Sequence, residues 1–244
     1  MIGIIGMGYV GSAIYANIDR QYIDKVYVYD KYKKLKKNSN LKMLKFNCEF
    51  IFVCVSTPEN EDGSINSSNV LEVLDELKDY SGTIILKSTI LESDIPDLNN
   101  LVYNPEFLNQ RTSNKDFQTQ DYIVIGGEIQ NTSAVAEMYT LIFNLGNKFE
   151  LCSIKEASNF KYLRNIKSAL ELLFWEFAED ITKDSRKISN MLKNIPLSDM
   201  SIIGMDGFRG YGGACLPKDV NAFNHKHGHL LTKFMKEYND TLDV

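Results

Sequence analysis

The chain has 244 residues, of which 44% are apolar and 24% are charged, and its formal net charge is −5. This composition is typical of a soluble globular protein of one large domain or two small ones, and no apolar run approaches the roughly 20 residues that span a bilayer. The negative charge argues against a general nucleic-acid-binding protein, because such domains are usually basic. The first residues lack the charged and long apolar regions of a signal peptide, so we expect a cytoplasmic protein without a membrane partner.

The cysteines and histidines predict no metal site. The four cysteines are widely spaced without a Cys-x-x-Cys pair, and the three histidines all lie within residues 225–229. Zinc sites usually need closely spaced ligand pairs. We therefore expect reduced thiols and no metal, with the histidine run interpreted either as a solvated turn between helices or as a loose metal ligand set.

The N-terminal residues have the order of a dinucleotide-binding unit. A short apolar strand leads into the Gly-x-Gly-x-x-Gly sequence of residues 6–11, a helix is expected to about Ile18, and a second strand ends at Asp30. In this unit the first glycine makes a tight turn, the second lets the pyrophosphate reach the backbone, and the third lets the helix pack on the strand. The helix N-terminus then faces the phosphates. The residues predicted to bind the dinucleotide here are Gly6, Gly8, Tyr9, Val10, Gly11 and Asp30.

Asp30 bears on the choice of cofactor. It lies 19 residues after Gly11, near the spacing expected for an acid that binds the adenosine ribose hydroxyls. Its charge would repel a ribose 2′-phosphate, which favours NAD over NADP. Residues 31–45 follow with seven lysines. We interpret this segment as a solvated helix or loop, with tolerance of NADP as the alternative.

The next segments alternate between strands and helices. Apolar runs predict strands at residues 49–55, 83–86, 101–103, 122–125 and 148–152, and helices are expected at 67–79 and 133–144. This alternation predicts an α/β fold, a Rossmann-like doubly wound and mostly parallel sheet, over residues 1–152. Thr57 and Pro58 follow the strand 49–55, at the end of the strand where ligands bind in such sheets.

After residue 153 the pattern is helical only. Apolar residues from Phe160 to Ile181 recur with a 3.6-residue period and predict one long helix. Lys161 and Asn165 are four residues apart and therefore share a face of it. We expect this central helix to join two parts of the fold or to pack against a second subunit in a homodimer. Shorter helices, expected at residues 185–194, 199–203, 217–225 and 230–242, complete an all-helical domain over residues 153–244.

Residues 207–219 combine a glycine-rich turn with three reactive side chains, Cys215, Lys218 and Asp219. Glycines let the backbone approach a ligand closely, and Pro217 suits the first position of a helix. Cys215 would then lie at a helix N-terminus, which favours a thiolate, with Asp219 on the same side. The alternative is an ordinary glycine turn with a buried cysteine and a solvated Lys–Asp pair.

Five motifs in this order resemble the UDP-glucose/GDP-mannose dehydrogenase family. They are Gly6–Gly11, Lys87–Thr89, Asn104–Leu108, Lys161 with Asn165, and Gly212–Asp219. They span nearly the whole chain, and the last is the most diagnostic. The resemblance implies that two NAD molecules oxidise the C6 alcohol of a nucleotide sugar to a carboxylate, as in the conversion of UDP-glucose to UDP-glucuronate.

The resemblance also implies roles for individual residues. Cys215 would capture the aldehyde as a thiohemiacetal, which is oxidised to a thioester and hydrolysed. Lys161, Asn165 and Asp219 would stabilise the developing oxyanion and organise water. Thr89 and Glu106 would position substrate and water. Further cofactor contacts are implied for Thr57, Pro58, Thr89 and Lys218. Substrate contacts are implied for Glu106, Phe107, Leu108, Lys161, Asn165, Tyr211 and Gly212.

The chain also departs from the family pattern. Family members usually continue with a second α/β domain that binds the nucleotide half of the substrate, and we expect that a separate chain supplies it here or that the substrate is smaller. Gln110 stands where the family has an acid, and Arg209 where it has an aromatic residue. The choice of nucleotide sugar therefore stays open. Two alternatives also stay open, a module that binds NAD or a partner with weak or no activity, and a small hydroxyacid dehydrogenase.

Overall fold

The computed structural model describes residues 1–35, 39–145, 148–182, 184–192, 209–228 and 230–242. It divides into two compact units, residues 1–57 with 66–161 and residues 58–65 with 162–244, and each is described by itself. The domain boundary predicted between residues 152 and 153 stays a prediction. The helix expected at 199–203 lies outside the described residues, as do the first two residues of the glycine turn and His229.

A seven-stranded sheet forms the centre of the first unit, in the order β2-β1-β3-β4-β5-β6-β7. The strands are β1 (Ile2–Ile5), β2 (Val26–Tyr29), β3 (Phe50–Val53), β4 (Thr83–Leu86), β5 (Leu101–Tyr103), β6 (Tyr122–Gly126) and β7 (Lys148–Cys152). Strands β1 to β5 are parallel, whereas β6 pairs antiparallel with β5 and parallel with β7. The predicted Rossmann-like, mostly parallel sheet is confirmed.

The register aligns the carboxyl ends of the strands next to the switch point. Ile5 lies opposite Tyr29 of β2 and Val53 of β3. The chain goes from β1 outward to β2 and then returns to the other side of β1 with β3. Ligands bind at such a reversal of strand order, so this edge positions the candidate cofactor site.

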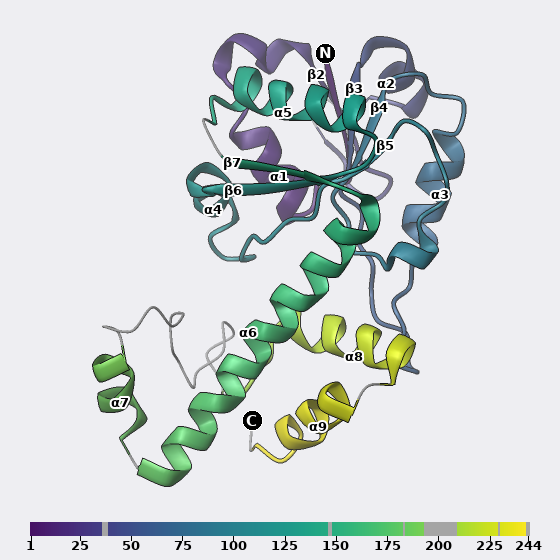
Figure 1. Cartoon of the computed structure of the whole chain (residues 1–244). Helices are drawn as coiled ribbons and strands as arrows, with labels where there is room; N and C mark the ends of the chain where they lie inside the picture. Colours follow the sequence, from purple (N-terminus) through teal and green to yellow (C-terminus); the bar gives the residue numbers. More distant parts are fainter. Residues whose placement is uncertain (36–38, 146–147, 183, 193–208, 229, 243–244) are drawn as a thin grey trace. The chain divides into compact units, whose positions relative to one another are not determined.

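Helices cover both faces of this sheet (Figure 1). One face is covered by α1 (Tyr9–Ala16), α4 (Ser113–Thr119) and α5 (Ile129–Phe143), and the other by α2 (Leu41–Asn47), α3 (Ser68–Glu76) and the start of α6 (Ile154–Thr182). Short 3-10 helices run over Arg20–Lys25 and Glu92–Asp94. Because successive strand side chains point to opposite faces and both faces are covered, most strands are largely apolar, whereas the edge strand β7 also carries Lys148 and Glu150. On β3, for example, Phe52 joins one core, and Ile51 and Val53 join the other.

The second unit is built from helices. It contains the remainder of α6, then α7 (Ser185–Leu192), α8 (Leu216–His227) and α9 (Leu230–Asn239). The long helix predicted from Phe160 is confirmed, and it begins six residues earlier, at Ile154. The core of the unit joins α6 to the later helices through Ile166, Ala169, Leu173, Tyr211, Leu216, Val220 and Met235.

Residues 58–65 also belong to the second unit. They form a turn closed by an antiparallel bridge between Glu59 and Ile65. The Asn221 Nδ2 of α8 donates a hydrogen bond of 2.7 Å to Glu59 Oε1, which joins this turn to the helix. Of the helices in the described part of the chain, none combines the length and the apolar character that a membrane span requires. Over the same residues, no group of three or more histidine, cysteine or acidic side chains is placed to hold a metal ion.

Candidate active site

The glycines after β1 are explained by what a side chain would meet. Gly6 has a φ of +89°, and a Cβ there would lie 2.6 Å from the carbonyl oxygen of Cys54. A Cβ on Gly11 would lie 2.0 Å from the Gly6 carbonyl oxygen, so only glycine lets α1 begin this close to β1. At Gly8 a Cβ would meet no protein atom within 4 Å. That open space, next to the N-terminus of α1, is where an anionic ligand would approach the backbone.

Asp30 follows β2 and is fixed by backbone donors. Its Oδ2 accepts a hydrogen bond of 2.8 Å from the Met7 N–H, and its Oδ1 accepts bonds of 2.9 Å from the N–H groups of Tyr32 and Lys33. Partial burial alone would raise the pKa of Asp30, but the three backbone bonds and the Lys33 charge lower it on balance. Asp30 is therefore a carboxylate that the backbone fixes at the end of β2.

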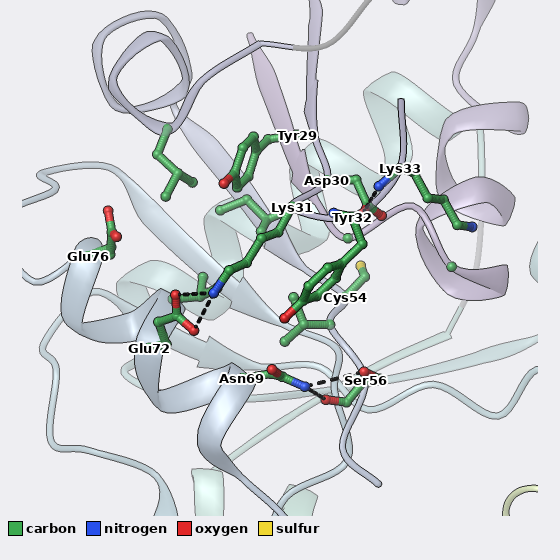
Figure 2. Close-up of a pocket in the computed structure, with 16 residues that line it drawn as sticks. Tyr29, Asp30, Lys31, Tyr32, Lys33, Cys54, Ser56, Asn69, Glu72 and Glu76 are labelled. Carbon is green, nitrogen blue, oxygen red and sulfur yellow. Dashed lines mark hydrogen bonds and ion pairs between the residues drawn. The ribbon is translucent and has the colours of Figure 1, made fainter. Parts of the chain in front are cut away.

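A cavity of about 250 Å³ lies at the carboxyl ends of β1, β2 and β3 (Figure 2). Gly6, Gly8 and Asp30 line it, together with Cys54 and residues of α3. Burial raises the pKa of the Cys54 thiol to about 12, so this cysteine is a neutral wall of the cavity. A cavity of this kind, with a carboxylate at the end of β2 and open space at Gly8, fits the adenosine and phosphate parts of NAD.

A buried cluster surrounds Glu106 after β5. Glu106 Oε1 accepts a bond of 3.3 Å from the Tyr9 hydroxyl, and Oε2 accepts one of 2.6 Å from the Leu108 N–H. Lys161 Nζ donates a bond of 2.7 Å to the Glu106 carbonyl oxygen and lies 3.8 Å from Oε1. It also lies 5.1 Å from the centre of the Phe107 ring. Both charged side chains are nearly inaccessible, and these hydrogen bonds together with the opposite charge compensate for their burial.

The lysine of the Lys87–Thr89 motif forms a network that sequence reasoning missed. Lys87 Nζ donates bonds of 2.9 Å to Asn104 Oδ1 and 3.4 Å to the Tyr139 hydroxyl, which itself donates a bond of 2.6 Å to Asn104 Oδ1. Burial lowers the pKa of Lys87 to about 8, with smaller opposing effects from Cys54 and Glu106. Thr89, which follows in the motif, is buried at the end of β4.

In the second unit, Cys215 caps helix α8. It is half-buried, and its carbonyl oxygen accepts the first helical bond, 2.9 Å from the Asp219 N–H. The Asp219 carboxylate is buried, accepts a short hydrogen bond from Asn165 Nδ2, and has Lys218 Nζ 3.4 Å from its Oδ1. Asp219 Oδ1 has no hydrogen-bond partner among the described residues. A thiol, a carboxylate and an amide thus lie around the first turn of one helix.

Two interactions hold the turn before α8, which contains Gly210, Gly212 and Gly213, and the sequence predicted neither. Asn239 of α9 accepts a bond of 2.8 Å from the Tyr211 N–H and donates one of 3.2 Å to the Tyr211 carbonyl oxygen. Arg209, which replaces an aromatic residue of the family pattern, donates to the fully buried Glu176 of α6 through Nε at 2.8 Å and through Nη2. Tyr211 itself is buried in the core of this unit, so its predicted contact with substrate stays a prediction.

Each unit brings together part of the predicted set. The first unit holds Gly6, Gly8, Tyr9, Val10, Gly11, Asp30, Thr57, Thr89, Glu106, Phe107, Leu108 and Lys161. The second holds Pro58, Asn165, Tyr211, Gly212, Cys215, Lys218 and Asp219. Lys161 and Asn165 lie one turn apart on α6, as their spacing predicted.

The Gly6–Gly11 turn, Asp30 and the cavity define a Rossmann-type dinucleotide-binding protein. A sequence model of the UDP-glucose/GDP-mannose dehydrogenase family, NAD binding domain, matches residues 20–143. The chain belongs to this family, and its cofactor is NAD.

Individual relatives agree with this assignment. The chain is 27% identical over 210 residues to a UDP-glucose 6-dehydrogenase of Rickettsia felis, covering 78% of the chain and 46% of that protein. It is 24% identical over 227 residues to the GDP-mannose 6-dehydrogenase of Pseudomonas aeruginosa, covering 81% of the chain and 51% of the relative. Its fold is similar to that of a UDP-glucose dehydrogenase of Pyrobaculum islandicum, with a TM-score of 0.76, 20% identity, and 98% of this chain and 67% of the other covered. The chain thus spans about half the length of the curated relatives it matches.

Proposed function

We propose that the chain is an NAD-dependent dehydrogenase that oxidises the C6 alcohol of a nucleotide sugar to the carboxylate. The observation that supports this most is the arrangement of Cys215, Asp219 and Asn165 at the start of α8. Oxidation of an alcohol to an aldehyde needs no nucleophile, whereas oxidation to an acid gains from a covalent intermediate on cysteine. Family membership makes a nucleotide sugar the leading substrate class.

In the proposed first step the sugar hydroxyl loses its proton and its carbon loses a hydride, which leaves an aldehyde. NAD, when bound, accepts that hydride. Lys161 is a buried cation bonded to the Glu106 carbonyl oxygen, so it is suited to stabilise the developing alkoxide. The Glu106 carboxylate, fixed by Tyr9 and by the Leu108 N–H, is the candidate acceptor for the proton, through water.

In the proposed second step the Cys215 sulfur adds to the aldehyde carbon and the carbonyl oxygen takes a proton, which gives a thiohemiacetal. Loss of a second hydride, which a second NAD accepts when bound, and loss of the hydroxyl proton convert it to a thioester. Water then adds to the thioester, the carboxylate leaves, and the thiol is restored. Asn165 and Asp219 are the candidate groups that polarise the carbonyl oxygen and orient this water.

Turnover with a panel of nucleotide sugars tests the proposal. NADH formation is expected with UDP-glucose, GDP-mannose or a UDP-N-acetyl sugar, and Cys215→Ser should abolish carboxylate formation. Cys152→Ser is the matched control, because Cys152 is a half-buried thiol in β7 with a pKa that burial raises to about 11. No turnover of any nucleotide sugar by a protein that binds NAD would contradict the proposal and favour the module alternative.

Four further statements stay predictions: a homodimer formed through α6, a separate chain that supplies the nucleotide-binding domain, a cytoplasmic location, and the contacts of Thr57, Pro58 and Lys218 with NAD. The small hydroxyacid dehydrogenase remains the second candidate enzyme. It leaves the Gly212–Asp219 motif unexplained, so the nucleotide-sugar reaction is preferred.

A further inference from the structure

Lys31 is the first residue after the ribose-binding acid, and it is held by an ion pair across the cofactor cavity. Its Nζ donates to both carboxylate oxygens of Glu72, at 2.6 and 2.9 Å. Figure 2 shows the Lys31 side chain reaching from the end of β2 to Glu72 on α3. Asp30, Lys31 and Glu72 all line the cavity. The lysine that follows Asp30 is therefore directed to a protein acceptor.

The second lysine of the same turn is also engaged. Lys33 Nζ donates a bond of 2.5 Å to the carbonyl oxygen of Met7, within the Gly6–Gly11 turn. From the sequence alone, residues 31–45 are expected to be a solvated helix or loop, with tolerance of NADP as the alternative. In the structure the two lysines nearest Asp30 are instead occupied by acceptors of the protein itself.

The bonding of Lys31 to Glu72 bears on the discrimination between NAD and NADP. NADP differs from NAD only by a phosphate on the adenosine 2′-oxygen. A free lysine beside the ribose attracts that phosphate as a point charge, whereas a carboxylate repels it. Asp30 opposes the phosphate, and Lys31 would favour it if its ammonium group were available.

We propose that Glu72 determines cofactor specificity as a positioning residue, by holding Lys31 away from a ribose 2′-phosphate and so maintaining preference for NAD. The proposal rests on the assignment of NAD to this cavity and not on the identity of the sugar substrate. Glu72 need not touch the cofactor, because it acts through Lys31. Asp30 and Glu72 then act together, one by repelling the phosphate and the other by occupying the nearest cation.

The pair is open to solvent, and this sets the size of the effect. The Lys31 and Glu72 side chains are 50% and 52% exposed, so the pair stabilises the fold little, and removing Glu72 should leave the unit folded. An exposed pair of this kind constrains its lysine weakly, so its effect on an equilibrium constant is at most about fivefold. We therefore expect Glu72→Gln to lower the ratio of the NADP to the NAD dissociation constant by up to about fivefold.

Isothermal titration calorimetry with NAD and with NADP on the full chain tests the proposal. Glu72→Gln should lower the ratio, Lys31→Met alone should leave it nearly unchanged, and the double variant should return to the wild-type ratio, because no lysine remains to be released. Glu76→Gln is the matched control. Glu76 lies one turn further along α3, lines the same cavity and carries the same charge, but is not bonded to Lys31.

Several outcomes overturn the proposal: the same fall in Glu76→Gln, a fall that persists in the double variant, an unchanged ratio in Glu72→Gln, or a wild-type protein that binds NADP as tightly as NAD. The same fall in Glu76→Gln would mean that removing any negative charge from the cavity wall lowers the ratio. Failure of the dehydrogenase proposal is a separate result, since it would leave NAD binding and its selectivity measurable. Absence of binding by both nucleotides would overturn the cofactor assignment together with this inference.

Discussion

Lys87 offers a test of the energetics behind the candidate site. It is 4% exposed, and within the described residues it forms no ion pair, only bonds to Asn104 and Tyr139. Its pKa falls from 10.5 to about 8 because burial penalises the charged form, with Cys54 and Glu106 opposing that effect and Lys161 adding to it. We consider Lys87→Met, which keeps the length of the side chain and removes the charge.

The sign follows from the proton balance. Below pH 8 both the folded and the unfolded chain hold the Lys87 proton, and the folded chain carries the full cost of a buried cation. Between pH 8 and 10.5 the unfolded chain binds more protons, so the free energy of unfolding rises with pH. The difference between 10.5 and about 8 corresponds to about 3 kcal/mol, of which about 2 kcal/mol should be recovered between pH 7 and 9.5.

Urea unfolding followed by far-UV circular dichroism at pH 7, 8, 9 and 9.5 measures this effect. The free energy of unfolding of the wild type minus that of Lys87→Met should rise by about 2 kcal/mol over the series, because groups common to both proteins cancel. Lys115→Met, which removes an exposed lysine on α4, is the control for the substitution itself. A flat line for Lys87→Met, or a Lys87 Cε resonance that titrates near pH 10.5 in carbon NMR, would refute the reasoning.

Gly11→Ala should lower Tm by several degrees, because its Cβ would lie 2.0 Å from the Gly6 carbonyl oxygen. Gly8→Ala is the matched variant. It should keep the wild-type Tm but weaken NAD binding, because its Cβ would meet no protein atom and would enter the space proposed for the cofactor. Thermal unfolding measures Tm and calorimetry measures NAD affinity for both variants. Equal NAD affinity of Gly8→Ala and wild type would contradict the prediction for Gly8. Arg209→Met should cost about 3 kcal/mol in urea unfolding, because it leaves the buried Glu176 carboxylate without its cation. The double variant Arg209→Met/Glu176→Gln should recover most of the lost free energy of unfolding. If Arg209→Met alone is as stable as the wild type, the Arg209–Glu176 pair does not stabilise the fold.

The sheet and the long helix were predictable because their signals are local. Short apolar runs, separated by glycines or helical patterns, are enough to specify the strands, and the central ones are buried on both faces. The glycine turn and Asp30 were predictable for the same reason, since each acts through its own backbone geometry and a fixed spacing. Helix α2 begins within residues 31–45, for which the sequence left open a solvated helix or a loop, and helix α4 was not predicted. Each buries a single residue, Leu44 and Phe117 respectively, so neither shows a usable apolar period.

The interactions that organise the candidate site depend on tertiary contacts between distant residues. Lys87 and Tyr139 are 52 residues apart, and no local pattern distinguishes their buried network from an exposed lysine and a core tyrosine. The same holds for the Lys31–Glu72 pair, 41 residues apart, within a segment that reads as solvated. Motif resemblance identified Cys215, Asp219 and Asn165 as a set, but only the structure showed that Asp219 is buried and bonded to Asn165.

The central claim, that Cys215 carries a sugar aldehyde to the acid, predicts a stoichiometry. Wild-type protein supplied with excess NAD and a limiting amount of its nucleotide sugar should form two NADH for each carboxylate released, measured by absorbance at 340 nm and by mass spectrometry of the product. Protein quenched in acid during turnover should carry the acyl group on Cys215. One NADH for each sugar, with free aldehyde as the product and an unmodified Cys215, would contradict the account.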